Sequence, residues 1–119
     1  MAAISVLQIF NAEEIAKNAN ASFDVNLERM NAEGFFSLQI TLTGTGTAKG
    51  EYLVSNNKVN WVEPTGASDI FDGFTVASGP GTDGKDIFSF EPELSAHLRI
   101  KITEADVNPI VVSAWLAVQ

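Results

Sequence analysis

His97-Leu-Arg-Ile-Lys-Ile-Thr103 is a stretch in which polar and apolar residues alternate without a break. Successive side chains of a β-strand point to opposite faces, so this pattern predicts a strand with one face in a core and the other in water. The same alternation fills Phe36-Ser-Leu-Gln-Ile-Thr-Leu-Thr43 and Phe23-Asp-Val-Asn-Leu-Glu28. By contrast, Ile110-Val-Val-Ser-Ala-Trp-Leu-Ala-Val118 is apolar at nearly every position, which is typical of a strand covered on both sides. These stretches place the chain among the all-β proteins.

Further short stretches have the composition of strands, and clusters of Gly, Pro, Asn and Thr separate them. They are residues 4–10, 50–55, 59–62, 73–77 and 86–90. About eight or nine short strands at this spacing predict an antiparallel β-sandwich that is jelly-roll-like. A parallel sheet would need crossover helices, and only Ala12–Asn20 has helical composition, so we expect at most one short helix near residues 12–20. We expect a single β-sandwich domain over residues 1–119.

The composition excludes several classes of protein. With 119 residues, of which 45% are hydrophobic, the chain can bury a core and is not intrinsically disordered. It has no cysteine, which excludes disulfides, thiolate zinc sites and cysteine nucleophiles. No stretch approaches the roughly 20 consecutive apolar residues of a membrane helix. No basic residue precedes Lys17, so we expect no secretory signal peptide.

The net charge of -8 argues against nucleic acid as a partner, because phosphate binding needs a basic surface. This charge is concentrated in residues 63–93, which contain seven carboxylates against Lys85 alone. The simplest interpretation is a solvated face of loops that keeps the protein soluble. The alternative is a calcium site, because hard cations prefer carboxylate and carbonyl oxygens. Its candidate ligands are Asp69, Asp72, Asp83 and Asp86. Their spacing fits no EF-hand loop, and no other cofactor is expected.

Catalytic motifs are absent from the sequence. The single histidine, His97, lies on the polar side of its alternating stretch, so we expect it at the surface. No Gly-x-Ser-x-Gly elbow is present, and zinc hydrolases usually use two or more histidines. We therefore expect a protein that is not an enzyme. The two tryptophans, Trp61 and Trp115, fit a role in filling the core; alternatively, they are planar platforms that bind a sugar.

Three stretches between residues 50 and 103 form a recognisable pattern, namely Glu51-Tyr-Leu-Val-Ser-Asn-Asn-Lys-Val-Asn-Trp61, Phe88-Ser-Phe-Glu-Pro92 and Ala96-His-Leu-Arg-Ile-Lys-Ile-Thr103. This part of the chain resembles the discoidin-like, galactose-binding-like jelly rolls. Those domains have a Ser-x-Asp-Gly-x-x-Trp hairpin, then a Phe-x-x-Pro turn and an Arg-Ile strand; here Asn57-Lys58 replaces Asp-Gly. The resemblance implies a jelly roll. The corresponding alternative function is a carbohydrate-binding module that uses Trp61, Trp115 and the loops of residues 63–86.

A larger part of the chain resembles small, acidic, cysteine-free bacteriophage virion proteins. This resemblance rests on Ser55-Asn-Asn-Lys-Val-Asn-Trp61, Leu98-Arg-Ile-Lys-Ile-Thr-Glu104 and Ala114-Trp-Leu-Ala-Val-Gln119. It implies a non-enzymatic structural protein for capsid decoration, the neck or the tail, which forms homo-oligomers or docks on a larger shell. The implied location is the virion, assembled in the host cytoplasm. The expected partners are other virion proteins and copies of the chain itself, with no nucleic acid or membrane, and a glycan only under the alternative.

Overall fold

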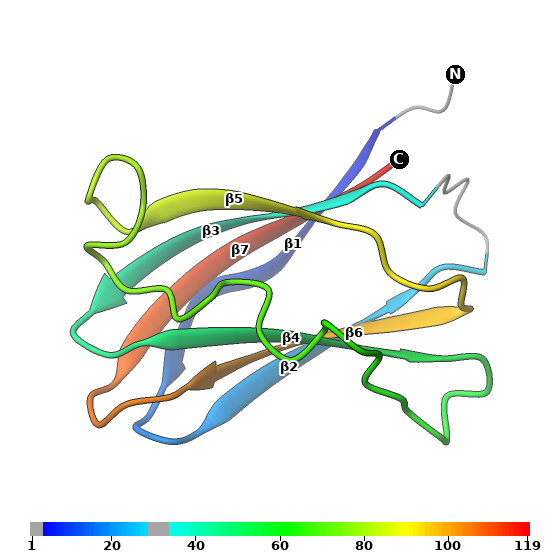
Figure 1. The fold of residues 1–119 in the computed structure, drawn as a ribbon, viewed down its shortest axis with the longest axis horizontal. Helices are drawn as coiled ribbons and strands as arrows, with labels where there is room; N and C mark the ends of the chain where they lie inside the picture. The colour runs from blue at the N-terminus through cyan, green and yellow to red at the C-terminus, as the bar shows by residue number, and fades with distance from the viewer. Residues whose placement is uncertain (1–3, 29–33) are drawn as a thin grey trace.

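The chain forms two antiparallel β-sheets that face each other (Figure 1). The computed structural model describes residues 4–28 and 34–119. The four-stranded sheet has the order β1-β7-β3-β5, with β1 at Ser5–Ile15, β7 at Ile110–Val118, β3 at Phe36–Gly44 and β5 at Lys85–Phe90. The three-stranded sheet has the order β2-β6-β4, with β2 at Asn20–Asn26, β6 at His97–Glu104 and β4 at Ala48–Ser55. The predicted antiparallel, all-β sandwich is confirmed.

The order of the strands is that of a jelly roll that lacks one strand. From β1 to β4, and again from β5 to β7, each strand lies in the sheet opposite to that of the strand before it. An eight-stranded jelly roll has one further strand in the second sheet. In its place, residues 56–84 run beside the free edge of β4 and touch it through isolated bridges at Val62 and Phe74. The described residues therefore form seven strands rather than eight or nine.

Two predicted strands, residues 59–62 and 73–77, are reduced to these single bridges. The physical reason is the backbone between and beside them, because a residue with positive φ departs from the β conformation and interrupts a regular ladder. Positive φ recurs at Lys58, Gly66, Asp72 and Gly73. Between the two bridges the segment stays beside β4 through single hydrogen bonds, from the N–H of Tyr52 to the carbonyl of Ala67 and from the N–H of Ile70 to the carbonyl of Gly50.

No helix forms at residues 12–20. β1 continues to Ile15, which pairs with Ile110, and β2 begins at Asn20, which pairs with Thr103. A helix this short is marginal by itself in water, so pairing with strands far away in the sequence overrides the local composition. β1 is irregular along this part: its register with β7 shifts twice, and Ala12 has a φ of 49°.

The alternating stretches fill the core as predicted. Their inward-facing side chains on β3, β6 and β7 are completely or almost completely buried. They are Leu38, Ile40, Leu42, Leu98, Ile100, Ile102, Val112, Ala114 and Leu116. On the side of the sandwich between β4 and β5, the rings of Phe71, Phe74 and Phe88 pack together with centroids 4.9 to 6.3 Å apart. Residues 56–84 thus contribute aromatic side chains to the core although they form no strand.

One end of the sandwich is closed by a buried carboxylate, that of Glu104, which has an exposed fraction of 0%. Its Oε1 accepts a hydrogen bond from the backbone N–H of Asn18 at 3.1 Å. Its Oε2 accepts from the N–H groups of Thr47 at 3.0 Å and Asp106 at 2.7 Å. These amides belong to the β1–β2, β3–β4 and β6–β7 turns. A Cβ on Gly46 would lie 2.8 Å from Oε2, so this position needs a glycine.

The hydrogen bonds keep Glu104 ionised. Burial raises the pKa of this carboxyl, but the backbone donors of Thr47, Asp106 and Asn18 together outweigh burial and hold the pKa below its ordinary value of 4.5. Among the described residues, no Lys or Arg forms an ion pair with Glu104. The charge is therefore stabilised by backbone dipoles rather than by a cation.

We expect Glu104→Ala to lower the free energy of unfolding by at least about 3 kcal/mol, because three backbone N–H groups lose their acceptor at about 1–3 kcal/mol each. Urea denaturation at neutral pH measures the change. Asp106→Asn is the matched control, since this exposed carboxylate lies in the same turn and its loss should change stability by no more than about 0.5 kcal/mol. Equal losses in the two variants would contradict the role of Glu104.

The lowered pKa of Glu104 also predicts a pH dependence. Its contribution to stability is complete above the unfolded-state pKa of 4.5 and is lost as the pH falls through the lower folded-state pKa. We expect the wild-type protein to lose stability more steeply than Glu104→Gln as the pH falls below about 5, because the amide does not titrate. Urea midpoints across this range test the difference. Parallel curves would show that other carboxylates cause the acid sensitivity.

Candidate functional site

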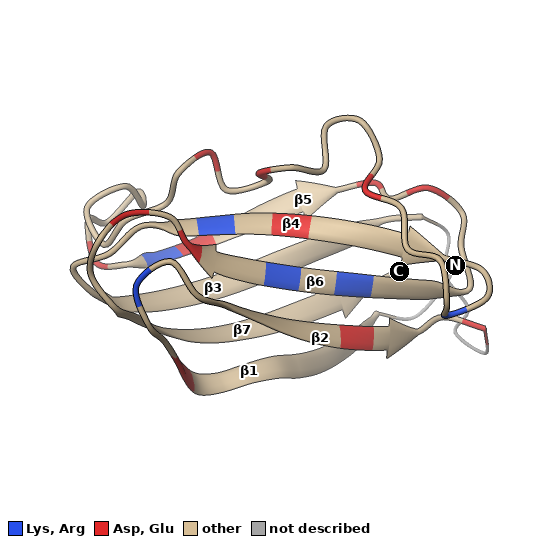
Figure 2. Ribbon diagram, turned by 90° about the horizontal axis from the view of Figure 1, so that it is seen from below, with Lys and Arg blue, Asp and Glu red and all other residues tan. Residues whose placement is uncertain are grey.

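Charged side chains are segregated between the two sheets (Figure 2). The outer face of the three-stranded sheet carries charges on all of its strands, whereas β3 and β7 contain no charged residue. The charged residues are Asp24 on β2, Lys49 and Glu51 on β4, and Arg99 and Lys101 on β6. Outward positions of β3 and β7 hold instead Ser, Thr, Gln, Val, Ala and Trp. The sandwich therefore has one charged outer face and one whose two central strands are uncharged, since the charges of the four-stranded sheet lie on its edge strands, β1 with Glu13 and Glu14 and β5 with Lys85 and Asp86.

On the charged face, Arg99 joins β6 to β2 and to Trp61. Its Nε lies 2.7 Å from Asp24 Oδ1, and its Nη2 lies 3.0 Å from Asp24 Oδ2. The hydrogen bond from Arg99 is the largest cause that lowers the pKa of Asp24. The guanidinium carbon also lies 4.0 Å from the centroid of the Trp61 ring, in a cation–π contact. Trp61 thus packs against a cation, and Arg99 occupies one face of its ring.

The same face holds a pair of carboxyl groups that the sequence did not single out, Glu51 and Glu63. Their mutual hydrogen bond is the first cause that raises the pKa of Glu63, followed by burial. Lys49 Nζ lies 3.8 Å from Glu51 Oε1. The carboxyl groups and this ammonium group form a local network, so these charges interact with one another rather than with a distant partner.

His97 is buried, with an exposed fraction of 6%, and the prediction that it lies at the surface is wrong. It begins β6, the central strand of its sheet, and is paired with Asn26 on one side and Ser55 on the other. These neighbouring strands cover an outward-facing side chain that alternation alone assigns to solvent. Its Nε2 lies 3.1 Å from Glu28 Oε1. The imidazole is therefore held in place by a carboxylate.

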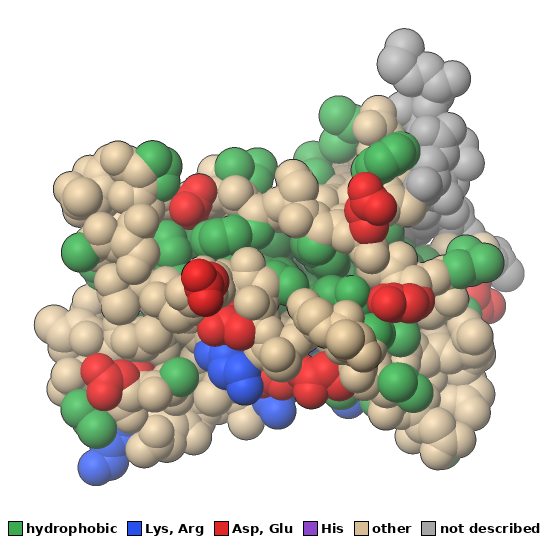
Figure 3. All heavy atoms as spheres, viewed as in Figure 1, with side chains coloured by type: hydrophobic (Ala, Val, Ile, Leu, Met, Phe, Trp, Pro, Cys, Tyr) green, Lys and Arg blue, Asp and Glu red, His purple; other side chains and the backbone are tan. Residues whose placement is uncertain are grey.

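Acidic side chains are spread across the face between β4 and β5, around a band of hydrophobic side chains (Figure 3). Some of the acidic residues between 63 and 93 make structural contacts. Glu93 Oε1 accepts a hydrogen bond from the Tyr52 hydroxyl at 3.2 Å. Burial, followed by this hydrogen bond, raises the pKa of Tyr52. Part of the charge in this segment therefore holds the segment on the sandwich.

The four candidate calcium ligands have separate positions. Asp69 accepts hydrogen bonds from the backbone N–H groups of Gly50, Phe71 and Gly73, at 3.1, 3.1 and 2.9 Å, and so shapes its own loop. Asp86 Oδ1 accepts from the N–H of Ile87 at 2.7 Å. The other two candidates, Asp72 and Asp83, are exposed. Within residues 4–28 and 34–119, no group of three or more His, Asp or Glu side chains is placed to hold a metal ion.

We expect millimolar calcium or EDTA to leave the melting temperature unchanged, because backbone donors already use the Asp69 carboxylate and the other candidates do not converge on it. Differential scanning fluorimetry measures this, with magnesium as the matched control for general ionic effects. A rise in melting temperature that is specific to calcium would show a site that binds the folded state.

The uncharged face has Trp115 near its centre. Trp115 on β7 pairs directly with Gln8 on β1 and Gln39 on β3, and Gln39 pairs with Ile87 on β5. These four side chains, called here the Trp115 row, share the outer face of the four-stranded sheet. A cavity of about 360 Å³ adjoins the row and is lined by Gln39, Pro80, Lys85, Asp86 and Ile87. Trp61 lies over the other sheet, so the structure does not bring the two tryptophans together.

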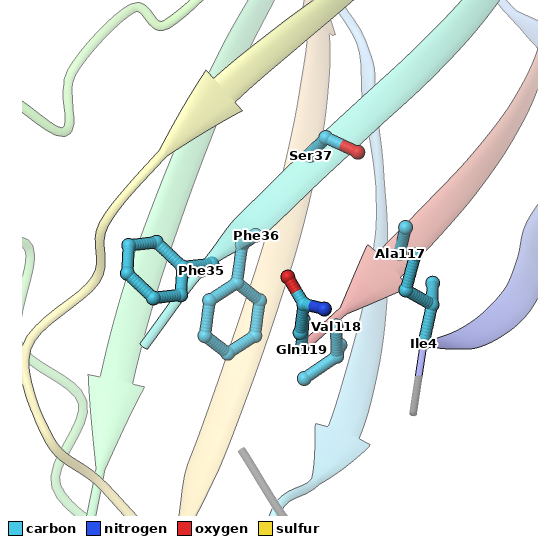
Figure 4. A pocket seen from close by; sticks show the side chains of 7 residues that line it. All are labelled: Ile4, Phe35, Phe36, Ser37, Ala117, Val118 and Gln119. Carbon is cyan, nitrogen blue, oxygen red and sulfur yellow. The ribbon is translucent and has the colours of Figure 1, made fainter. Parts of the chain in front are cut away.

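At the end of the sandwich opposite Glu104, exposed apolar side chains gather around a pocket together with Ser37 and Gln119 (Figure 4). A shallow cavity of about 130 Å³ opens there between the start of β3 and the end of β7. It is lined by Ile4, Phe35, Phe36, Ser37, Ala117, Val118 and Gln119. A second hollow beside Phe36 reaches Leu94. Ile4, Phe35 and Leu94 are 64%, 54% and 100% exposed, and these three residues define the apolar end.

The sequence matches no protein-family model and no curated protein. Among solved structures, a chain in the structure of infectious bursal disease virus Gx strain is similar over 99% of this chain and 32% of that chain, with a TM-score of 0.56 and 10% identity. The enzymatically active domain of bacteriophage CBA120 tailspike protein 4 matches over 92% of this chain and 15% of that chain, with a TM-score of 0.49 and 15% identity. This chain spans about a third of the viral chain. At such identities the similarity concerns the fold alone.

Within the residues that the structure describes, no helix is long and apolar enough to cross a membrane.

Proposed function

We propose that this protein is a non-enzymatic structural component of a bacteriophage virion, in capsid decoration, the neck or the tail. In this proposal it associates with copies of itself, or docks on other virion proteins, through the apolar end. The apolar end is the observation that carries the proposal. Ile4, Phe35 and Leu94 expose large hydrophobic side chains around two hollows, on a chain with a net charge of -8. Large hydrophobic side chains that are exposed at one end of a domain favour a contact site between proteins there.

The fold supports a location in a virion. The order of the strands is that of a jelly roll, an architecture that viral capsid domains use. The likeness to a chain of infectious bursal disease virus extends over nearly the whole of this chain. Together with the sequence resemblance to small phage virion proteins, this favours a packing role in a particle assembled in the host cytoplasm.

The surface chemistry supports a role without catalysis and without nucleic acid. The only histidine of the sequence is buried against Glu28, where a substrate could not reach it as a general base must. Cations on the charged face are engaged by neighbouring carboxylates, as with Arg99 and Asp24. The net charge of -8 also repels phosphate.

We expect the wild-type protein to self-associate at micromolar concentration and the double variant Phe35→Ser/Leu94→Ser to associate at least about tenfold more weakly, because burying each side chain is worth about 1.5–3 kcal/mol. Multi-angle light scattering across a dilution series measures this. Val107→Ser is the matched control, since Val107 is 63% exposed in the turn beside Glu104, at the other end. Unchanged association in the double variant would contradict this use of the apolar end, and a monomeric wild-type protein would contradict self-association and leave docking on another virion protein as its use.

A further inference from the structure

We propose that the Trp115 row and the cavity beside it bind a neutral oligosaccharide. The row is built by strand register. Directly paired residues of an antiparallel sheet project from the same face with their Cβ atoms about 5 Å apart. Gln8, Trp115, Gln39 and Ile87 are successive partners across four strands, so they form a line about 14 Å long at the usual strand spacing of about 4.8 Å. That length suits an extended chain of sugar rings.

Trp115 is the tryptophan that is free to stack on a sugar. Trp61 already packs against the guanidinium of Arg99. In the described part of the chain, Trp115 has no aromatic or cationic partner for its ring, although it lies half-buried on the solvent side of the sheet. A fixed indole supplies a large apolar surface of the kind that the C–H face of a pyranose covers.

The residues beside Trp115 supply the hydrogen bonds that sugar hydroxyls need. The side-chain amide of Gln39 is exposed and has no partner among the described residues, so its donors and its acceptor are both available. Gln8 donates one weak bond, 3.4 Å long, to the carbonyl of Phe10, and its own carbonyl stays available. In the adjoining cavity, Lys85 adds an ammonium donor beside the apolar side chain of Ile87, because Lys85 and Ile87 are alternate residues of β5 and share its outer face.

The charge of this surface indicates a neutral ligand. No charged residue belongs to the row, and Lys85 is the charged residue that the cavity adds on the outer face, since Asp86 pairs with the core-facing Ile40. A polyanion would be repelled by the net charge of -8, and a polycation would bind the acidic face instead. A second copy packed flat on this face would bury the Lys85 ammonium group, which has no ion-pair partner among the described residues, and such burial is costly. Sugar hydroxyls would satisfy this group.

Tryptophan fluorescence tests the site directly, because the sequence contains only Trp61 and Trp115. In the variant Trp61→Phe, emission reports on Trp115 alone, and in the matched variant Trp115→Phe it reports on Trp61 alone. We expect titration with neutral oligosaccharides, namely cellohexaose, maltohexaose, mannohexaose and galactan fragments, to change the emission of Trp61→Phe and to leave that of Trp115→Phe unchanged. Polygalacturonate serves as the acidic control and should bind neither variant.

We expect Gln39→Ala to weaken binding about tenfold in isothermal titration calorimetry, since it removes hydrogen bonds from an exposed position where folding is not at stake. Failure of every neutral oligosaccharide to bind, or equal responses of the two tryptophan variants, would overturn the proposal. So would a Trp115 emission that changes with protein concentration in the absence of sugar, because a second copy would then cover the face. Light scattering of Phe35→Ser/Leu94→Ser tests the virion proposal independently, since those residues are outside the row and its cavity.

Discussion

The buried carboxylate of Glu104 is the constraint on which the arrangement of strands depends. An ionised group without a cation is tolerated in a core only when hydrogen bonds replace water, and backbone amides of three turns supply those bonds here. Each of these turns carries the chain from one sheet to the other. Their common acceptor therefore fixes the turns relative to one another, and with them the register in which β1, β3 and β7 lie side by side.

The two outer faces of the sandwich differ in how many charged residues they carry and in how these residues interact with their neighbours. On the three-stranded sheet, Arg99 contacts both Asp24 and Trp61, and Lys49 with Glu51 and Glu63 forms a second local network. These interactions stabilise that face but leave few of its charged groups available to bind a partner. The central strands β7 and β3 of the four-stranded sheet have no charged residue, so Trp115 and Gln39 keep their surfaces and hydrogen-bonding groups available.

Period-two alternation was sufficient to predict strands where each residue's face is decided locally, as in residues 36–43 and 97–103. If the alternation of residues 97–103 is extended by one residue, it also places Glu104 on the core-facing side. A charged residue is not expected in a core, so this part of the pattern is easily missed. Where pairing with strands that are far away in the sequence decides the structure of a segment, the local sequence is not sufficient to predict it. Residues 59–62 and 73–77 have strand composition but lie among positive-φ positions, and His97 is covered by neighbouring strands. Likewise, nothing near Trp115 in the sequence reveals that Gln8 and Gln39 flank it, because that depends on register between strands more than seventy residues apart.

The central position of β7 has a consequence for how the protein is made. β1 pairs with β7 from Ser5↔Val118 to Ile15↔Ile110, and β3 pairs with the other side of β7. During synthesis, β1 therefore leaves the ribosome without a partner and remains so until residues 110–118 follow. Because the four-stranded sheet closes around its last-made strand, folding must wait for nearly the whole domain, and the unpaired β1 is exposed to misassociation in the meantime. The four-stranded sheet thus folds in one step after residues 110–118 have been made, rather than strand by strand during synthesis.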